Sequence, residues 1–156
     1  MAQQLWLLRH GDAEPHGVRH DNDRRLTEKG ERQGRMAGKA LAKLGVNFAA
    51  VFTSPRVRAR DTARLACEEI GADPLVHQPL SAGFDVEEAL ALLAGYGEDA
   101  RLLLVGHEPD FSQVVFDLTG GRIDLKKGGI AAVRVDGRQG EQFDLLRPKE
   151  IEEIAE

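Results

Sequence analysis

Three short apolar runs constrain the fold of this chain more than any other feature. They cover residues 5–8 (LWLL), 48–53 (FAAVFT) and 102–105 (LLLV). Short uninterrupted apolar runs are typical of strands that are buried on both faces. Because helical patterns lie between them, the sequence predicts an α/β fold: a three-layer sandwich in which helices flank a mostly parallel central sheet.

Two helices are predicted together with their ends. The first covers residues 28–44, with Thr27 placed to cap its start and Gly45 to end it. The second covers residues 57–70 and ends at Gly71. Further elements are expected along the rest of the chain: helices over 86–93 and 109–118, strands over 129–135 and 142–146, and a short acidic segment after Pro148.

The composition narrows the class of protein. With 42% hydrophobic and 30% charged residues, the chain is typical of a globular protein, and we expect one domain over residues 1–156. Its N-terminal apolar run is far shorter than the roughly 20 residues of a membrane span and has no basic n-region before it. Cys67 is the only cysteine, which excludes an intramolecular disulfide and a Cys-rich zinc site. We therefore expect a cytoplasmic monomer without a membrane partner.

The charges are unevenly distributed along the chain. Residues 1–64 carry 13 Lys+Arg against 7 Asp+Glu, a balance of +6, whereas residues 65–156 carry 8 against 19, a balance of -11. A basic half is compatible with nucleic acid, with a small anionic ligand or with a solvated surface. Because aromatic side chains that could stack on bases are scarce, we do not expect a nucleic acid partner.

Cationic residues and histidines follow the three predicted strands directly. Arg9 and His10 follow the first, Arg56 and Arg58 the second, and His107 the third. Ligands of open parallel sheets bind beyond the carboxyl ends of the strands, so neighbouring strands would bring these side chains to one pocket. Phosphate fits such a set best, because arginine forks match its oxygens. Arg58 is favoured over Arg56, because it lies in the first turn of the second helix, where free N–H groups attract an anion.

The same residues belong to a longer pattern that resembles the histidine phosphatase superfamily, the phosphoglycerate-mutase-like fold. Its blocks occur in the family's order between residues 9 and 107: Arg9-His10-Gly11, residues 26–30 (LTEKG), residues 54–63 (SPRVRARDTA) and Gly106-His107. The first tripeptide alone is a weak signal, whereas the ordered set is specific. The short chain and the opening Arg-His-Gly-Asp-Ala are similar to the SixA-type branch, the bacterial phosphohistidine phosphatases.

The resemblance implies a role for each matching residue. His10 would be the catalytic nucleophile, forming a phosphohistidine intermediate that water then hydrolyses. Arg9, Arg58 and His107 would be catalytic too, binding the transferred phosphoryl group and offsetting the charge on its oxygens. Arg24 matches a further phosphate-binding arginine of the short branch, although Arg25 beside it could compete. The resemblance implies no cofactor.

The general acid has no clear signal in the sequence. Larger members of the superfamily place a carboxylic acid after the second helix, but residues 79–88 contain no clear match. Asp12, Ser81, Asp85 and Glu108 are candidates that the sequence does not rank. An imidazole leaving group departs more easily than an alkoxide, since imidazole is protonated with a pKa of ~6.5. A phosphohistidine substrate therefore needs less help from an acid.

Other residues of functional type receive structural interpretations. His16 and His20 have the i,i+4 spacing of metal ligands, but Pro15 and Gly17 disfavour a helix there, so no metal site is expected. His77 is interpreted as a surface residue. The pair Lys126-Lys127 is interpreted as part of a solvated turn. Contact of these lysines with an acidic or phosphorylated partner remains the alternative.

The predicted function is a cofactor-independent phosphatase that acts through His10. The expected partner is a phosphorylated substrate, namely a histidine-phosphorylated protein. Two alternatives remain at this point. One is a phosphatase of a small phosphorylated metabolite, and the other is a non-catalytic phosphoprotein-binding module, which would need no nucleophile.

Overall fold

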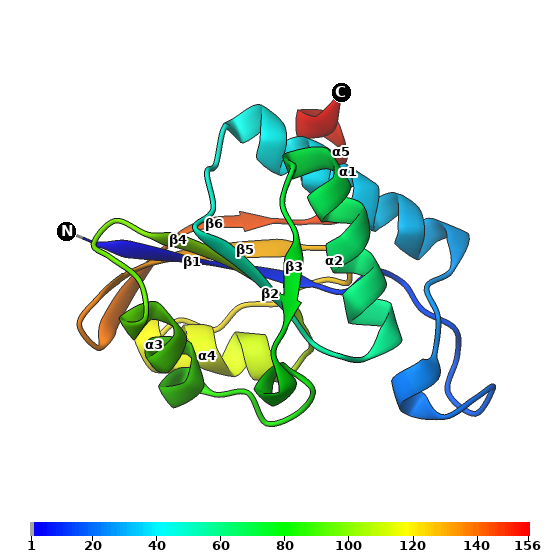
Figure 1. The fold of residues 1–156 in the computed structure, drawn as a ribbon, viewed down its shortest axis with the longest axis horizontal. Coiled ribbons are helices and arrows are strands. Elements are labelled where there is room, and N and C mark those ends of the chain that lie inside the picture. The colour runs from blue at the N-terminus through cyan, green and yellow to red at the C-terminus, as the bar shows by residue number, and fades with distance from the viewer. Residues whose placement is uncertain (1) are drawn as a thin grey trace.

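The three apolar runs form neighbouring strands of one six-stranded sheet. The computed structural model describes residues 2–156 and orders the strands β3-β2-β4-β1-β5-β6 (Figure 1). The apolar runs lie in β1 (Gln3–Arg9), β2 (Ala50–Thr53) and β4 (Arg101–Gly106), with β4 between the other two. The four central residues of β1 and of β4 are almost fully buried, which is why these runs contain no polar side chain.

The sheet is parallel on one side and antiparallel on the other. Strands β3 (Pro74–Val76), β2, β4 and β1 run parallel, whereas β5 (Ile130–Asp136) and β6 (Gln139–Leu146) join as an antiparallel hairpin. The register pairs Arg9 with Gly106 at the ends of β1 and β4. His10 and His107, the next residues of the two strands, therefore leave the sheet side by side.

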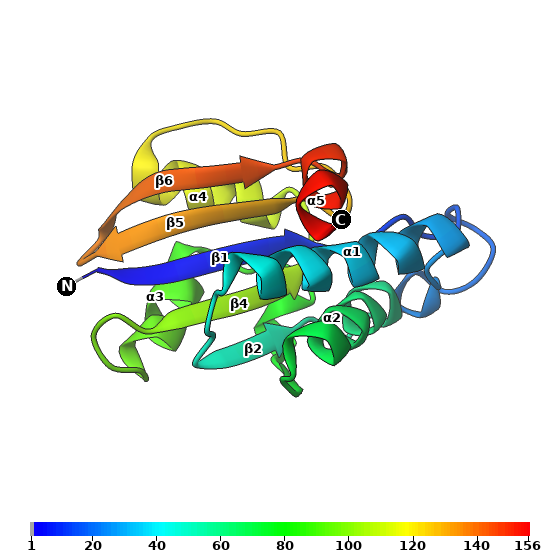
Figure 2. The same ribbon diagram turned by 90° about the horizontal axis from the view of Figure 1, so that it is seen from above.

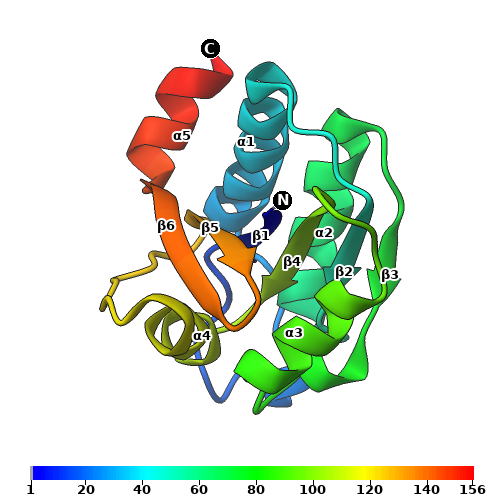
Figure 3. The ribbon, with the colours of Figure 1, turned by 90° about the vertical axis from the view of Figure 1, so that its left-hand side faces the viewer.

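Helices cover both faces of the sheet (Figures 2 and 3). One face carries α1 (Glu28–Leu44), α2 (Val57–Ile70) and α5 (Pro148–Ala155), and the other carries α3 (Val86–Ala94) and α4 (Asp110–Thr119). Two short 3-10 helices, η1 (Asp21–Asp23) and η2 (Gln78–Leu80), lie in the loops. The predicted three-layer α/β sandwich is confirmed. No helix within residues 2–156 has the length and apolar character needed to cross a membrane.

The ends of α1 and α2 are set by local chemistry, as predicted. The Thr27 hydroxyl accepts a hydrogen bond from Gly30 N, and Gly45 ends α1 with a φ of 71°. Gly71 ends α2 with a φ of 73°. Close packing fixes the position of α1, because a Cβ on Gly38 would lie 2.5 Å from the carbonyl oxygen of Ala66 on α2.

Two elements differ from the sequence prediction. β3 was not predicted; it is a short edge strand with a proline, and its Leu75 and Val76 side chains are exposed. The acidic segment after Pro148 is in fact the helix α5. Its start is fixed by Glu150, whose carboxylate accepts hydrogen bonds from the backbone N and the guanidinium of Arg147, and Ile151 anchors it in the core.

Candidate active site

A cavity of about 340 Å³ opens at the carboxyl ends of β1, β2 and β4. Most of its wall is charged or imidazole-bearing, and it is lined by Arg9, His10, Ala13, Glu14, Pro15, His16, Asp21, Arg24, Arg56, Arg58, His107, Glu108 and Lys127. All five site residues predicted from the sequence therefore lie together. Of the two competing arginines, Arg24 is buried in this wall, while Arg25 is exposed and does not line it.

The two imidazoles of the cavity face each other. The ring centroids of His10 and His107 are 5.2 Å apart, and the residues are only 6% and 7% exposed. Burial lowers the pKa of His10 to about 3, and the positive charges of Arg58 and Arg9 add to that effect. Burial, together with His10 and Arg58, lowers the pKa of His107 to about 2. Both rings are therefore neutral at pH 7.

A backbone carbonyl fixes the proton of the His10 ring. His10 Nδ1 lies 2.7 Å from the carbonyl oxygen of Gly11, which can only accept a hydrogen bond. Nδ1 must therefore carry the ring proton, and Nε2 keeps its lone pair. A neutral imidazole with a free Nε2 lone pair is a nucleophile.

His107 is oriented by the residue that follows β2. Its Nε2 lies 2.7 Å from Ser54 Oγ, which also accepts a hydrogen bond from Arg56 N. When the Ser54 hydroxyl donates to Nε2, His107 Nδ1 carries the ring proton. That Nδ1 atom is buried and has no hydrogen-bond partner within residues 2–156.

The arginines also retain unused donors. Arg9 Nη1 donates to the carbonyl of Leu125 at 2.9 Å, and Arg58 Nη1 donates to the carbonyl of Asp21 at 2.7 Å. The Nε atoms of Arg9 and Arg58, by contrast, are buried without a partner in the described chain. The guanidiniums of Arg9 and Arg58 line the cavity, and their positive charge favours an anionic ligand there.

Asp21 is a central residue of the cavity that the sequence did not reveal. Its carboxylate accepts from Arg24 Nε at 2.9 Å, from Arg56 Nη1 at 2.8 Å and from Arg58 Nη2 at 3.3 Å. Burial opposes ionisation of this carboxyl, but the charges and hydrogen bonds of Arg58 and Arg24 outweigh it and hold its pKa below the ordinary value. Asp21 therefore orients three guanidiniums as a permanent anion. A lone carboxylate in a polar loop has no periodic signal that could have identified it.

Arg56, which the sequence disfavoured relative to Arg58, also contributes to the cavity. It lines the cavity, and besides Asp21 its Nε donates to Ser81 Oγ at 3.3 Å. Arg58 lies deeper, at 4% exposure, in the first turn of α2. The preference for Arg58 as the inner cation is consistent with this arrangement.

Backbone contacts hold the segment after β1 in place. Gly128 N donates to the carbonyls of Arg9 and His10, both at 3.0 Å. Gly11 N donates to Thr62 Oγ1 at 3.0 Å, and Asp12 N donates to the side-chain oxygen of Gln33 at 2.8 Å. Three segments far apart in the sequence therefore hold the backbone around His10 in place.

The four candidate acids are now distinguished by their surroundings. Asp85 caps α3, Asp12 accepts from the Thr27 hydroxyl at 2.8 Å, and Ser81 accepts from Arg56. Only Glu108 among the four lines the cavity, and its carboxylate accepts hydrogen bonds from the backbone N and the hydroxyl of Ser112.

The remaining histidines do not gather around a metal position. Within residues 2–156 there is no group of three or more His, Cys, Asp or Glu side chains arranged to hold a metal ion. His16 lines the outer cavity, and His20 caps η1. His77, interpreted from the sequence as a surface residue, is in fact half-buried, because its ring packs against Phe52 and Phe84.

The comparisons with known proteins agree with this geometry. The family model of the histidine phosphatase superfamily (branch 1) matches residues 5–81, which include His10 and Arg58. An uncharacterized protein of Picosynechococcus sp. is 39% identical over 139 residues, which cover 84% of each chain. The chain belongs to the histidine phosphatase superfamily. The predicted resemblance is confirmed, and membership indicates a phosphatase, that is, a hydrolase.

Solved structures give the branch and confirm the fold. The structure of the protein histidine phosphatase SixA complexed with tungstate has a TM-score of 0.84 and 25% identity, covering 96% of this chain and 99% of that one. This histidine phosphatase is thus of the short SixA type. A proposed alpha-ribazole-5'-P phosphatase from Escherichia coli shares the fold, with a TM-score of 0.79 and 20% identity, over 95% of this chain and 98% of that one.

Proposed function

We propose that this chain is a phosphohistidine phosphatase that removes the phosphoryl group from a histidine of a protein by way of His10. One observation carries the proposal. The neutral His10 ring has its Nε2 lone pair free, in a cavity that is also lined by Arg9, Arg58 and His107. A nucleophile beside cationic side chains is the arrangement that phosphoryl transfer requires.

In the first step, His10 Nε2 attacks phosphorus. A bond from Nε2 to phosphorus forms while the bond from phosphorus to the substrate imidazole breaks, and the departing imidazole nitrogen takes a proton from solvent water. In the second step, water attacks the phosphorus on His10, the bond from Nε2 to phosphorus breaks, and inorganic phosphate leaves and returns one proton to the solvent. Burial keeps His10 neutral before each cycle, so no proton must be removed before it attacks.

The cations act on the phosphoryl oxygens. Arg9, Arg24 and Arg58 supply guanidinium N–H donors, and His107 supplies an imidazole, all from the wall of the same cavity. The charge on the equatorial oxygens is offset by donors that are already in place, which is the main source of acceleration for such a reaction.

The carboxyl groups of the cavity support a phosphohistidine substrate over a phosphate ester. Asp21 and Glu14 have pKa values below the ordinary range, so both are ionised and cannot donate a proton at pH 7. Glu108 accepts hydrogen bonds from the backbone N and the hydroxyl of Ser112. Asp21 and Glu14 could therefore not protonate an alkoxide leaving group, whereas imidazole requires less protonation.

The test is release of phosphate from a histidine-phosphorylated phosphotransfer domain, with wild type and the His10→Ala variant. We expect turnover by wild type only, and acid-labile phosphate that can be trapped on His10. Efficient turnover of small phosphate esters with no activity on the phosphoprotein would assign the alternative metabolite phosphatase. Phosphate binding without turnover of any substrate would assign the binding module.

A further inference from the structure

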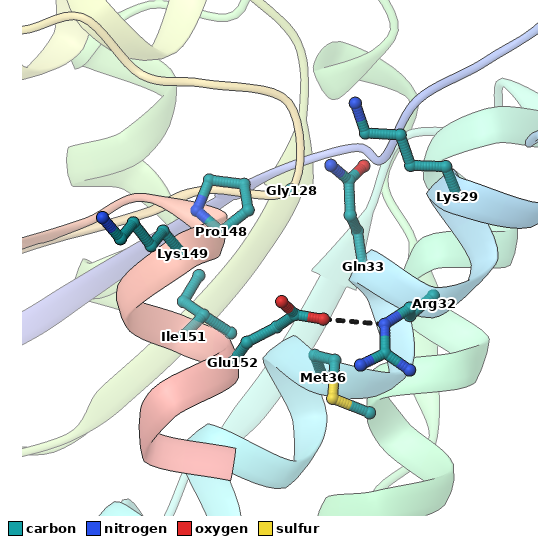
Figure 4. A pocket seen from close by; sticks show the side chains of 9 residues that line it. All are labelled: Lys29, Arg32, Gln33, Met36, Gly128, Pro148, Lys149, Ile151 and Glu152. Carbon is teal, nitrogen blue, oxygen red and sulfur yellow. Dashed lines mark hydrogen bonds and ion pairs between the residues drawn. The ribbon is translucent and has the colours of Figure 1, made fainter. Parts of the chain in front are cut away.

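A second cavity lies beside the active site, between α1 and α5. It has a volume of about 390 Å³ and is called here the α1/α5 groove (Figure 4). Helix α1 supplies one wall and α5 the other, and the lining residues are Lys29, Arg32, Gln33, Met36, Gly128, Pro148, Lys149, Ile151 and Glu152. Nothing in the proposed reaction uses this groove.

The groove has an apolar floor and a charged rim. Met36 from α1 and Ile151 from α5 lie at its base, with Pro148 at one end (Figure 4). Arg32 Nε and Glu152 Oε1 form an ion pair of 2.7 Å that joins the two helices across the groove. A floor of this kind suits apolar side chains of a partner segment, while the rim selects by charge.

The groove and the catalytic cavity share a wall. Gly128 lines the groove, and the preceding residue Lys127 lines the catalytic cavity. Gly128 N donates to the carbonyls of Arg9 and His10, so the backbone of the nucleophile is one hydrogen bond away from the groove. A protein bound in the groove would therefore extend directly to the phosphate site.

The rim of the groove is positive. Glu152 is neutralised by Arg32, and the lysines Lys29 and Lys149 are exposed on opposite walls (Figure 4). Neither lysine takes part in any ion pair within residues 2–156.

We propose that the α1/α5 groove docks an acidic, partly apolar segment of the protein that carries the phosphohistidine. This inference rests on the proposed function and adds the kind of partner to it. Carboxylates of the segment would pair with Lys29 and Lys149, and an apolar side chain would cover Met36 and Ile151. Charge complementarity at a rim acts mainly by raising the association rate, so docking would favour a phosphoprotein over a small substrate.

The test compares two substrates with the double variant Lys29→Glu/Lys149→Glu. On a histidine-phosphorylated phosphotransfer domain with an acidic surface, we expect kcat/KM to fall about tenfold at low salt, mostly through KM, and the difference to shrink as salt screens the charges. On phosphoramidate, which is too small to reach the groove, kcat/KM should stay within about twofold. Lys39→Glu is the matched control, because Lys39 is exposed on α1 but does not line the groove.

An unchanged kcat/KM of the Lys29→Glu/Lys149→Glu variant on the phosphoprotein would overturn the docking inference and leave the proposed function standing. Equal losses on both substrates would overturn it too, because the change would then act on the catalytic cavity. If wild type hydrolyses phosphoramidate but not the phosphoprotein, the proposed substrate itself is wrong and the docking inference falls with it. Lys29→Gln/Lys149→Gln should give a smaller loss than the charge reversal.

Discussion

The catalytic cavity has an imidazole side and a guanidinium side, and the two hold their side chains in different ways. His10 and His107 are held by uncharged partners, the Gly11 carbonyl and the Ser54 hydroxyl, and burial keeps both rings neutral. Arg24, Arg56 and Arg58 are held by the charged carboxylate of Asp21.

The difference follows from the chemistry proposed for each side. A nucleophile needs a free lone pair, so a buried, uncharged environment serves it best. Cations that bind phosphoryl oxygens must stay charged in the same buried cavity, which requires an anion nearby. Asp21 supplies that anion and still leaves Arg58 Nε unpaired within residues 2–156.

The largest expected effect separates the two sides. The His10→Gln variant should lose turnover by about 10⁴-fold or more, because no other group can accept the phosphoryl. Inorganic phosphate should still bind within a few-fold of wild type, since the guanidinium side is intact; calorimetry measures this. If the His10→Gln variant also loses phosphate binding, the imidazole side contributes to binding, and the proposed division between the two sides is wrong.

Loss of the inner guanidinium should weaken both binding and turnover. Arg58→Ala should reduce kcat/KM by about 10²–10³-fold, as expected for one preorganised donor to a transferring group. The steady-state rate and the inhibition constant of phosphate are the measurements. Arg60→Ala is the matched control, because Arg60 is exposed on the same helix and does not line the cavity. Similar losses in both variants would mean that general positive charge, rather than Arg58 placement, matters.

Removing the anion of the guanidinium side should have a smaller effect. Asp21→Asn should reduce kcat/KM about tenfold through KM, because hydrogen bonds to a charged group contribute ~1.5–3 kcal/mol and three arginines would lose part of their orientation. Asp23→Asn, at an exposed position of η1, should leave the rate unchanged. Tighter phosphate binding by Asp21→Asn would contradict this role and show that the carboxylate competes with the ligand.

The smallest effect is a pH dependence of stability that belongs to the imidazole side. Burial on folding lowers the pKa of His10 from its ordinary value of 6.5 to about 3, so between these values the unfolded chain binds a proton that the folded chain does not. Stability is complete above pH 6.5 and falls as the pH decreases toward 3, by up to ~1.4 kcal/mol per histidine per pH unit.

Urea unfolding at pH 7 and pH 5.5 measures this dependence. His10→Asn and His107→Asn should each lose less stability than wild type between the two pH values, because each lacks one imidazole that protonates on unfolding. Identical losses in wild type and both variants would show that these rings do not stay neutral in the folded protein.

Much of the fold could be predicted because its signals are local. The ends of α1 and α2 depend on Thr27, Gly45 and Gly71, which act on their own neighbours in the chain. The edge strand β3 was missed because its three residues form a strand only by pairing with β2. The helix α5 was missed for a similar reason: it is short, and it is stabilised by its contact with α1.

The sequence by itself determined which side chains follow each buried strand, and it predicted that Arg9, His10, Arg58 and His107 would gather at one edge of the sheet if those strands were neighbours, which the strand order shows they are. Strand pattern and chain direction are enough for that result, since the ends of parallel strands meet at the same edge. Only the tertiary structure decided the proton on His10, the anion at Asp21 and the groove between α1 and α5. These depend on atoms brought together by packing between segments far apart in the chain, and no local spacing encodes such contacts.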